Sequence, residues 1–248
     1  MAVGRYEATL ALANTAAVEC GLSTTPGLFA STDANFILLR NLINTVGREL
    51  AFMHPWRQLT KSASLTLAAA SAPAIHGVNA LPADFSWMGT GQNGTFWNTT
   101  DDWELTGPVT EQQWEYAIVN TLAPFNAIFK FEGNALWVYP PNATDVVTFK
   151  YQSLYWAKAS GQSSPNLSAC TADTDTVYFE PLLFTRLLKL RYLQARGRDT
   201  TAALVDFETT YSLSVQSDRP GRVLTVGGRS GRVRPLDSDN LPNTGYGS

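Results

Sequence analysis

The fold is decided near the C-terminal end, where residues 178–216 read YFEPLLFTRLLKLRYLQARGRDTTAALVDFETTYSLSVQ. On either side of Gly197, apolar side chains recur at spacings of three and four residues, which is typical of two amphipathic helices. Pro181 suits the first turn of the first helix, Gly197 the position after its end, and Asp199 the cap of the second helix. Two helices cannot bury such faces alone, so other segments must cover them.

Two more helices are expected near the N-terminus. Residues 5–21 carry small and apolar side chains at helical spacing and finish at Gly21, a residue that suits a helix end. A second apolar periodicity starts after Asp33, a good helix cap, and stops before Pro55. These helices can cover the C-terminal pair, and the four together predict a helical bundle.

The middle of the chain is rich in strand and turn signals. Polar and apolar residues alternate from Ser64 to Leu67 and along the longer run from Val146 to Trp156, while Gly133 and Asn134 separate two apolar runs as a hairpin turn would. We therefore expect an α+β protein. Its parts would be a helical bundle formed by residues 1–56 and 174–218, an inserted antiparallel β-rich lobe over residues 57–173, and an extended Arg-rich C-terminal arm over residues 219–248.

Composition excludes several classes of protein. The chain has 248 residues, of which 44% are hydrophobic, enough for a sizeable core. Only 16% are charged while 11% are aromatic, which indicates surface that partners cover. The net charge of −3 gives no general attraction to nucleic acid, and neither a membrane span nor a signal peptide is readable. Cys20 and Cys170 lack metal-ligand spacing and are expected to be free thiols, and we expect no metal or cofactor.

Charged residues are distributed unevenly. An acidic stretch without a base contains Asp101, Asp102, Glu104, Glu111 and Glu115. The C-terminal arm is basic and also carries apolar side chains; its residues of interest are Arg219, Arg222, Val223, Leu224, Val226, Arg229, Arg232 and Arg234. Such an arm can dock on an acidic protein surface, grip nucleic-acid phosphates, or serve as a soluble tail. The apolar residues favour docking, and the acidic stretch of a neighbouring copy is the candidate counter-surface.

Two patterns that could indicate catalysis are weak. Residues 89–94 have the glycine spacing of a dinucleotide-binding loop, but residues 95–100 make a poor start for the helix that such a loop requires. His54 and His76 are the only histidines, and neither lies in a metal-ligand pattern or near a nucleophile signature. We therefore expect that the protein is not an enzyme.

A carbohydrate-binding or glycan-hydrolysing tail module is the alternative function. Trp97 and Trp103 could stack on sugar rings, and the adjacent Asp101, Asp102 and Glu104 could be paired carboxylates for glycoside hydrolysis. Acids this close in sequence more often form a solvated loop or an ion-pairing surface. The pattern keeps this alternative open but does not favour it.

The order of these segments resembles the head-to-tail adaptor proteins of tailed bacteriophages, of the tail tubular protein A type. Residues 81–85, which consist of Leu81, Pro82, Ala83, Asp84 and Phe85, are similar to the Leu-Pro-x-Asp-Phe segment of that family. The hairpin over residues 131–140 resembles the family hairpin that ends in proline, and it is followed by the long strand and two closing helices. The resemblance covers residues 6–216. The sequence departs from the family pattern at residues 89–103 and in its Arg-rich C-terminal end.

This resemblance implies a virion structural protein of the neck or tail, made in the host bacterial cytoplasm. It implies a ring of about twelve copies beneath the portal protein. In such a ring one surface of each copy contacts a different surface of the next copy. The helical bundle would contact the portal and adjacent copies, and the β-rich lobe and arm would face neighbours and the distal tail or nozzle protein. Genomic DNA would pass through the central channel without being read. No membrane partner is implied.

Overall fold

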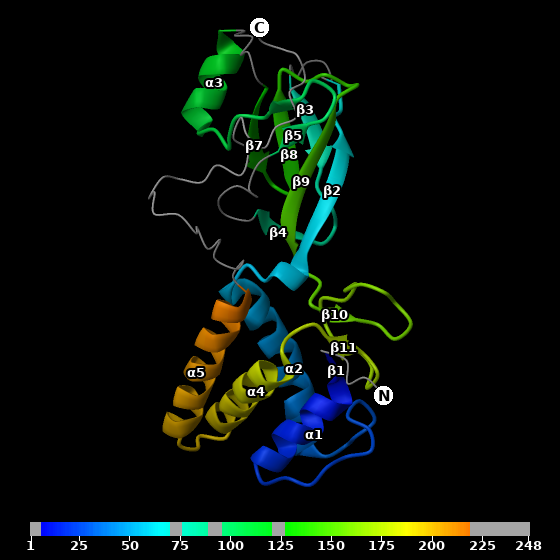
Figure 1. Cartoon of the computed structure of the whole chain (residues 1–248), viewed down its shortest axis with the longest axis vertical. Coiled ribbons are helices and arrows are strands. Elements are labelled where there is room, and N and C mark those ends of the chain that lie inside the picture. The colour runs from blue at the N-terminus through cyan, green and yellow to red at the C-terminus, as the bar shows by residue number, and fades with distance from the viewer. Residues whose placement is uncertain (1–5, 70–75, 89–95, 121–126, 219–248) are drawn as a thin grey trace, which may run out of the picture. The chain divides into compact units, whose positions relative to one another are not determined.

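The computed structural model describes residues 6–69, 76–88, 96–120 and 127–218. Within them the protein is α+β, with helices and antiparallel sheets (Figure 1). The helices are α1 (Thr9–Glu19), α2 (Ala34–Met53), a short 3-10 turn (Arg57–Leu59), α3 (Glu111–Val119), α4 (Pro181–Ala195) and α5 (Thr201–Asp218). The residues of the predicted arm, including Arg219 to Arg234, lie outside the described residues.

The helix boundaries follow local capping chemistry, and the predicted boundary residues occupy the expected positions. Asp33 caps α2 by accepting a hydrogen bond from the Asn35 backbone nitrogen at 2.7 Å, and Pro181 lies in the first turn of α4. Gly21 and Gly197, with φ of 76° and 62°, follow α1 and α4. Each supports the pair of backbone hydrogen bonds of a Schellman motif, because a left-handed conformation there costs glycine little.

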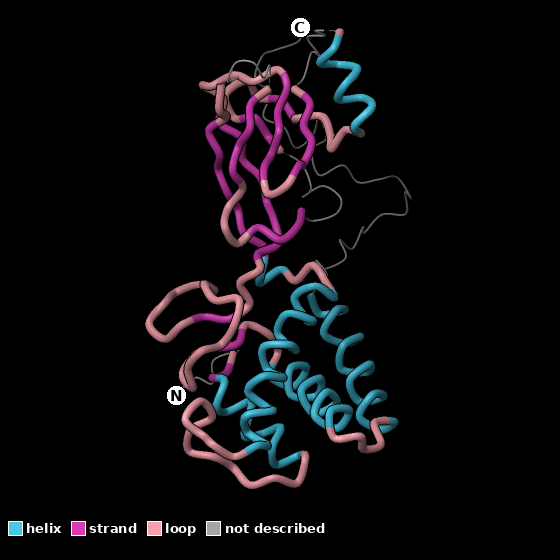
Figure 2. The backbone as a smooth tube through the Cα atoms, turned by 180° about the vertical axis from the view of Figure 1, so that it is seen from behind, coloured by secondary structure: helices cyan, strands magenta, loops and turns pink. Residues whose placement is uncertain are grey.

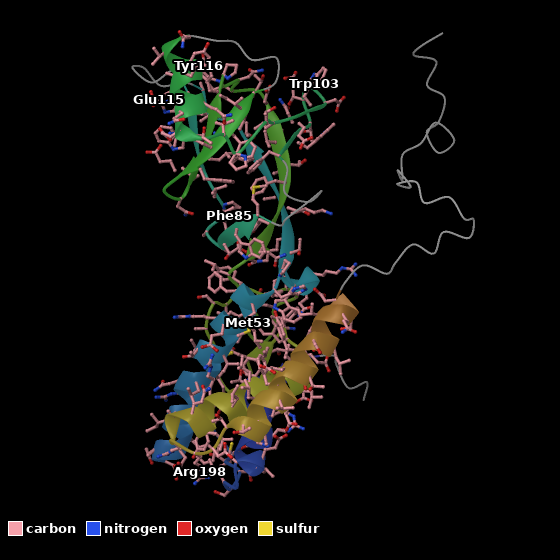
Figure 3. The ribbon with its side chains drawn as sticks, turned by 90° about the vertical axis from the view of Figure 1, so that its left-hand side faces the viewer. Met53, Phe85, Trp103, Glu115, Tyr116 and Arg198 are labelled. Atoms are coloured by element: carbon pink, nitrogen blue, oxygen red, sulfur yellow. The ribbon has the colours of Figure 1, made fainter. Side chains whose placement is uncertain are left out.

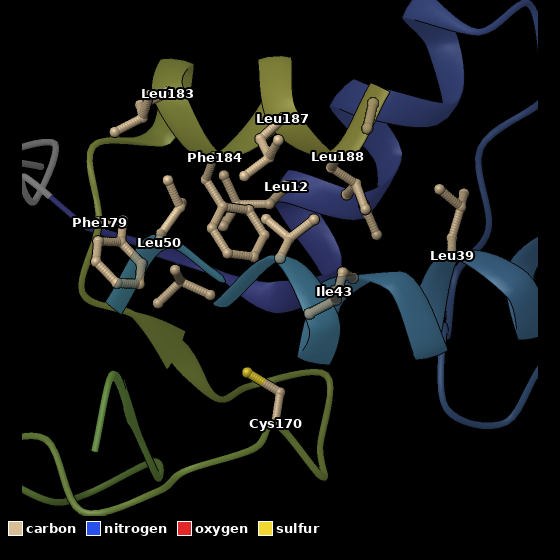
Figure 4. Close-up of a cluster of buried hydrophobic side chains, with 14 of the residues drawn as sticks. Leu12, Leu39, Ile43, Leu50, Cys170, Phe179, Leu183, Phe184, Leu187 and Leu188 are labelled. Carbon is tan, nitrogen blue, oxygen red and sulfur yellow. The ribbon is translucent and has the colours of Figure 1, made fainter. Parts of the chain in front are cut away.

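Helices α1, α2, α4 and α5 lie side by side (Figure 2) and share one hydrophobic core. In the close-up of Figure 4, side chains of α4 such as Phe184 and Leu187 meet Ile43 and Leu50 of α2, and all four are essentially inaccessible to solvent. Burial of several large apolar side chains in one cluster is the main source of stability for helices of this length.

Part of the segment between the strands and α4 packs with the helices. Trp156, Ala157 and Cys170 are buried in the helix core, although sequence analysis assigns residues 57–173 to the inserted lobe. The apolar periodicity of α4 predicts that its face is covered but does not say by which loop. Contacts group the chain up to Asp218 into one compact unit, so the boundaries of a separate lobe stay a prediction.

In the part of the chain that the structure describes, the strands form three antiparallel sheets. They are β1 (Glu7–Ala8), β2 (Thr60–Thr66), β3 (Gly77–Ala80), β4 (Phe85–Met88), β5 (Trp97–Asn98), β6 (Trp103–Glu104), β7 (Ile128–Glu132), β8 (Ala135–Tyr139), β9 (Val146–Ser153), β10 (Ala157–Lys158) and β11 (Thr176–Val177). The sheet orders are β1-β11-β10, β2-β9-β5-β6 with β4 also on β9, and β3-β8-β7. Strand β9 therefore connects β2, β4 and β5. A second apolar core takes side chains from this sheet and from β7 and β8, and includes Phe96, Phe129 and Phe149.

The predicted hairpin is confirmed, and one helix was not expected. In the β7–β8 hairpin Glu132 pairs with Ala135 across a turn made of Gly133 and Asn134. Helix α3 begins with a capping box in which Thr110 and Gln113 exchange side-chain to backbone hydrogen bonds. The Thr-x-x-Gln spacing that predicts this helix start is present in the sequence.

Candidate functional site

The Leu-Pro-x-Asp-Phe segment builds a buried polar cluster at the start of β4, which we call the Asp84 cluster and define as Lys61, Asp84, Tyr151 and Ser153. The Asp84 carboxylate accepts hydrogen bonds from Lys61 Nζ at 2.6 Å, Tyr151 Oη at 2.7 Å and Ser153 Oγ at 2.7 Å. Its backbone oxygen accepts another from the Leu154 nitrogen at 2.7 Å. One carboxylate thus joins β2, β4 and β9.

The remaining residues of the segment position this carboxylate. The backbone nitrogen of Phe85 donates to the carbonyl of Pro82 at 2.9 Å, which makes the chain turn at Asp84. Leu81 is buried in the strand core, and the Phe85 ring stacks on Tyr151 with centroids 5.6 Å apart. The segment therefore presents two apolar anchors and one carboxylate to the interior.

The hydrogen bonds of the Asp84 cluster favour the charged form of its carboxylate. Burial alone would raise the pKa of Asp84, but hydrogen bonds from Lys61, Ser153 and Tyr151 outweigh it and hold the pKa below its usual range. Burial, together with the nearby Asp84 carboxylate, raises the pKa of Tyr151. Ser153 donates its hydroxyl hydrogen to Asp84 and accepts from the Tyr155 nitrogen at 3.0 Å. A carboxylate whose pKa is lowered is a weak base toward the hydroxyl that it accepts from.

The acidic stretch is divided between two elements. Asp101, Asp102 and Glu104 belong to the turn and strand of the β5–β6 hairpin, whereas Glu111 and Glu115 lie on α3. Figure 3 shows Trp103 of the hairpin and Glu115 of α3 on opposite sides of the strands in that view. The stretch as a counter-surface for the arm stays a prediction.

Within the described residues, two of these five acids have partners. Asp101 accepts from Asn98 Nδ2 at 3.2 Å, and Glu111 accepts from Lys130 Nζ at 2.9 Å. These two carboxylates are therefore less available to a docking partner than the other three.

The β5–β6 register places the two exposed tryptophans on opposite faces. Trp97 pairs with Glu104 and Asn98 pairs with Trp103, so the side chains of Trp97 and Trp103 alternate across the hairpin. Their exposed fractions are 44% and 49%. A flat sugar platform needs both rings on one face, so this register disfavours the carbohydrate alternative.

A buried lysine between two tryptophans forms a second cluster, which sequence analysis missed. We call it the Lys130 box. Lys130 on β7 is only 7% exposed along its side chain, and its Nζ lies 2.9 Å from carboxylate oxygens of Glu111 and Glu132. The same nitrogen lies 5.1 Å from the ring centre of Trp114 and 4.9 Å from that of Trp137. The box fastens α3 to the β3-β8-β7 sheet through cation–π contacts and two ion pairs.

His76 contacts both tryptophans of this box. Its ring lies 4.3 Å from Trp137 and meets Trp114 edge-on at 5.7 Å. Burial lowers the pKa of His76, and the Lys130 charge lowers it further, while Glu132 and Glu115 act in the opposite direction. Protonation of His76 would place a second cation beside Lys130.

The wild-type protein is therefore expected to lose stability as the pH falls below about 6.5, because the unfolded chain then takes up the His76 proton before the folded chain does. The variant His76→Phe keeps the ring stacking and should show a smaller loss. Thermal unfolding midpoints at about pH 7.5 and about pH 5, on either side of the usual histidine pKa, measure the difference. Equal pH dependence in both proteins would contradict the assignment.

The remaining histidine and the two cysteines lie in the helical part of the protein, away from the two clusters. His54 Nε2 lies 3.3 Å from Asp218 Oδ2. Cys20 and Cys170 are unpaired and buried, and burial raises the pKa of Cys170 to about 12. Among the described residues, no group of three or more His, Cys, Asp and Glu side chains could hold a metal ion. In the same part of the chain, no helix has the length and apolarity needed to cross a membrane.

A groove on the helices, which we call the Arg48 groove, has a volume of about 520 Å³ and is lined by Thr45, Arg48, Glu49, Phe52, Met53 and Arg191. Phe52 and Met53, at the end of α2, are 62% and 40% exposed. Arg191 Nε donates to Glu49 at 2.9 Å. Within the described parts of the chain, Arg48 makes no hydrogen bond or ion pair. The groove is apolar and carries a net positive charge.

Comparison with protein-family models found no family that matches the chain, and no curated protein is significantly similar to it in sequence.

Proposed function

We propose that this protein is a virion structural protein that forms a head-to-tail adaptor ring in a tailed bacteriophage. The observation that supports this most is the set of large apolar side chains left exposed on the helices. Besides those of the Arg48 groove they include Val18, Leu182, Leu204, Val205 and Leu213. Apolar side chains that solvent reaches on the four helices α1, α2, α4 and α5 indicate surfaces that other chains cover.

In this proposal the helices α1, α2, α4 and α5 act as a bundle that contacts the portal protein and adjacent copies. The strands and the C-terminal arm face neighbours and the distal tail component, and the ring of about twelve copies leaves a channel for DNA. The protein does not act as an enzyme. The saturated hydrogen bonding of the Asp84 cluster supports that part of the proposal, because each oxygen that could accept a proton is engaged.

The native mass of the purified chain, measured alone and after mixing with portal rings from the same particle, tests the proposal. We expect a monomer alone and a complex of fixed ring stoichiometry with the portal, since a component that closes rings without its template would assemble prematurely. A chain that ignores the portal would overturn the adaptor function.

The same measurement on a chain that ends at Asp218 tests the arm. If the arm docks on a partner, the shortened chain should remain folded, as judged by its circular dichroism, but add poorly to the portal complex. Normal addition would show that the arm has another role.

A further inference from the structure

The exposure of large apolar side chains singles out two surfaces of this chain. Among the described residues, the three most exposed of these side chains are Val119 at 75%, Tyr116 at 65% and Phe52 at 62%. Phe52 lines the Arg48 groove, whereas Tyr116 and Val119 belong to α3. Single exposed apolar residues are normal, but neighbouring ones on one surface mark sites of interaction. Both surfaces are therefore candidates for contact with another chain.

The exposed side of α3 combines apolar side chains with an acid. We call it the Tyr116 face and define it as Gln112, Glu115, Tyr116 and Val119. These positions are separated by three and four residues, so they lie on one side of the helix, while Trp114 on the other side is buried. In the part of the chain that the structure describes, neither Glu115 nor Tyr116 makes an ion pair or a side-chain hydrogen bond. The carboxylate and the two apolar side chains can therefore meet one partner surface together.

The Lys130 box holds α3 in place and leaves the Tyr116 face toward solvent. Glu111, in the first turn of α3, accepts from Lys130 Nζ at 2.9 Å, and the buried ring of Trp114 lies 5.1 Å from the same nitrogen. The capping box of Thr110 and Gln113 fixes the start of the helix. A helix held in one position loses less entropy on binding than a free segment, which favours docking.

The Arg48 groove is complementary to this face in charge and in polarity. Phe52 and Met53 offer exposed apolar area, and the Arg48 guanidinium has no partner within the described residues. Arginine, methionine and aromatic side chains are enriched at the centres of protein interfaces, and a helix that lays its apolar face in a groove is a common mode of recognition. Because both surfaces are exposed in the same chain, they do not cover each other within one copy. Each copy therefore carries both halves of a possible contact.

We propose that the Arg48 groove of one copy binds the Tyr116 face of a second copy. The two apolar side chains of the face pack on Phe52 and Met53, and the Glu115 carboxylate meets the Arg48 guanidinium. The two surfaces differ, so the contact is heterologous and can be repeated from copy to copy around a ring. The inference deepens the proposed function and rests on it, because a ring requires such a contact between copies.

Crosslinking between two differently tagged chains, each with one added cysteine, tests this contact. One chain carries Thr45→Cys in the lining of the groove, and the other carries Gln112→Cys on the Tyr116 face; both positions are exposed. The native Cys20 and Cys170 are buried, so a short bis-maleimide should react little with them. In the matched control the second chain carries Ser64→Cys instead, at an exposed position on β2.

We expect the Thr45→Cys and Gln112→Cys chains to form the crosslinked heterodimer in clear excess over the control pair. Arg48→Glu in the groove chain should lower the yield about tenfold, because attraction between exposed charges becomes repulsion of similar size. Glu115→Arg in the other chain should restore the yield, whereas Glu104→Arg, which reverses an exposed acid outside the face, should not. Equal yields for the control pair, or yields that ignore these charges, would overturn the proposal.

The crosslinking is carried out on concentrated free chains and again on chains added to portal rings, with binding to the portal measured separately. Binding to the portal without the heterodimer overturns this inference and leaves the adaptor function standing, as it would if another protein occupied the groove. A heterodimer from chains that ignore the portal supports the contact and overturns the adaptor function. Absence of both overturns both.

Discussion

Replacing Asp84 with alanine is expected to lower the free energy of unfolding by about 3 kcal/mol. The variant would leave the Lys61 ammonium, the Tyr151 hydroxyl and the Ser153 hydroxyl without their shared acceptor. Lys61 keeps 28% of its side chain exposed, so water offsets part of the loss. Urea unfolding followed by circular dichroism measures the change.

Two matched variants separate this effect from a general loss of negative charge. Asp84→Asn keeps the size of the side chain and one acceptor oxygen, so it should cost less than Asp84→Ala. Glu104→Ala removes an exposed acid and should change stability by no more than about 0.5 kcal/mol. If Asp84→Ala behaves like Glu104→Ala, the cluster does not stabilise the fold.

The same carboxylate sets a pH dependence with a defined sign. Because hydrogen bonds hold the pKa of Asp84 below its unfolded value, its contribution is complete above about pH 4 and is lost as the pH falls through the folded pKa. That window lies below the one in which His76 acts. Asp84→Asn should therefore flatten the acid limb of the stability curve without changing the limb near neutrality.

Features set by local chemistry were predicted from the sequence. The ends of α1, α2 and α4 depend on Gly21, Asp33 and Gly197, whose hydrogen bonds reach only a few residues along the chain, and on Pro181, whose ring fixes the backbone of the first turn. The β7–β8 turn is equally local. The start of helix α3 was predictable in the same way, since Thr110 and Gln113 have capping-box spacing. The helix was not predicted because its apolar periodicity is too short to indicate a helix.

Features that join distant residues could not be predicted. The sequence singled out Asp84 only because it belongs to the Leu-Pro-x-Asp-Phe segment. The partners of Asp84, which are Lys61, Tyr151 and Ser153, come from two other strands, and no local sequence pattern fixes the register of those strands. The Lys130 box likewise depends on α3 folding over the β7 strand. Even the two tryptophans of the β5–β6 hairpin are assigned to opposite faces only when the pairing is known.

The second large effect is expected at Gly47, within α2. Glycine in the middle of a helix usually costs about 1 kcal/mol relative to alanine, so Gly47→Ala would ordinarily be stabilising. Here a Cβ atom at residue 47 would overlap the indole ring of Trp156, which is fully buried. Trp156 cannot withdraw easily, because its Nε1 donates to the Ser168 carbonyl at 2.9 Å and its ring packs near Phe184.

We therefore expect Gly47→Ala to reduce the free energy of unfolding by about 2 kcal/mol, since overpacking outweighs the gain in helix propensity. Urea unfolding followed by far-ultraviolet circular dichroism is the suitable measurement, because the fluorescence of Trp156 itself would change. A rise in stability would show that α2 and the loop carrying Trp156 can move apart at little cost.

A double-mutant cycle identifies the steric origin of the effect. Trp156→Leu alone leaves a cavity and should destabilise by about 3 kcal/mol, whereas the added methyl group of Gly47→Ala would fall into that cavity. In the Trp156→Leu background, Gly47→Ala should thus be neutral or stabilising, which gives a coupling energy of about 2 kcal/mol between the two sites. Additive losses would instead mean that alanine disturbs α2 through contacts other than the indole.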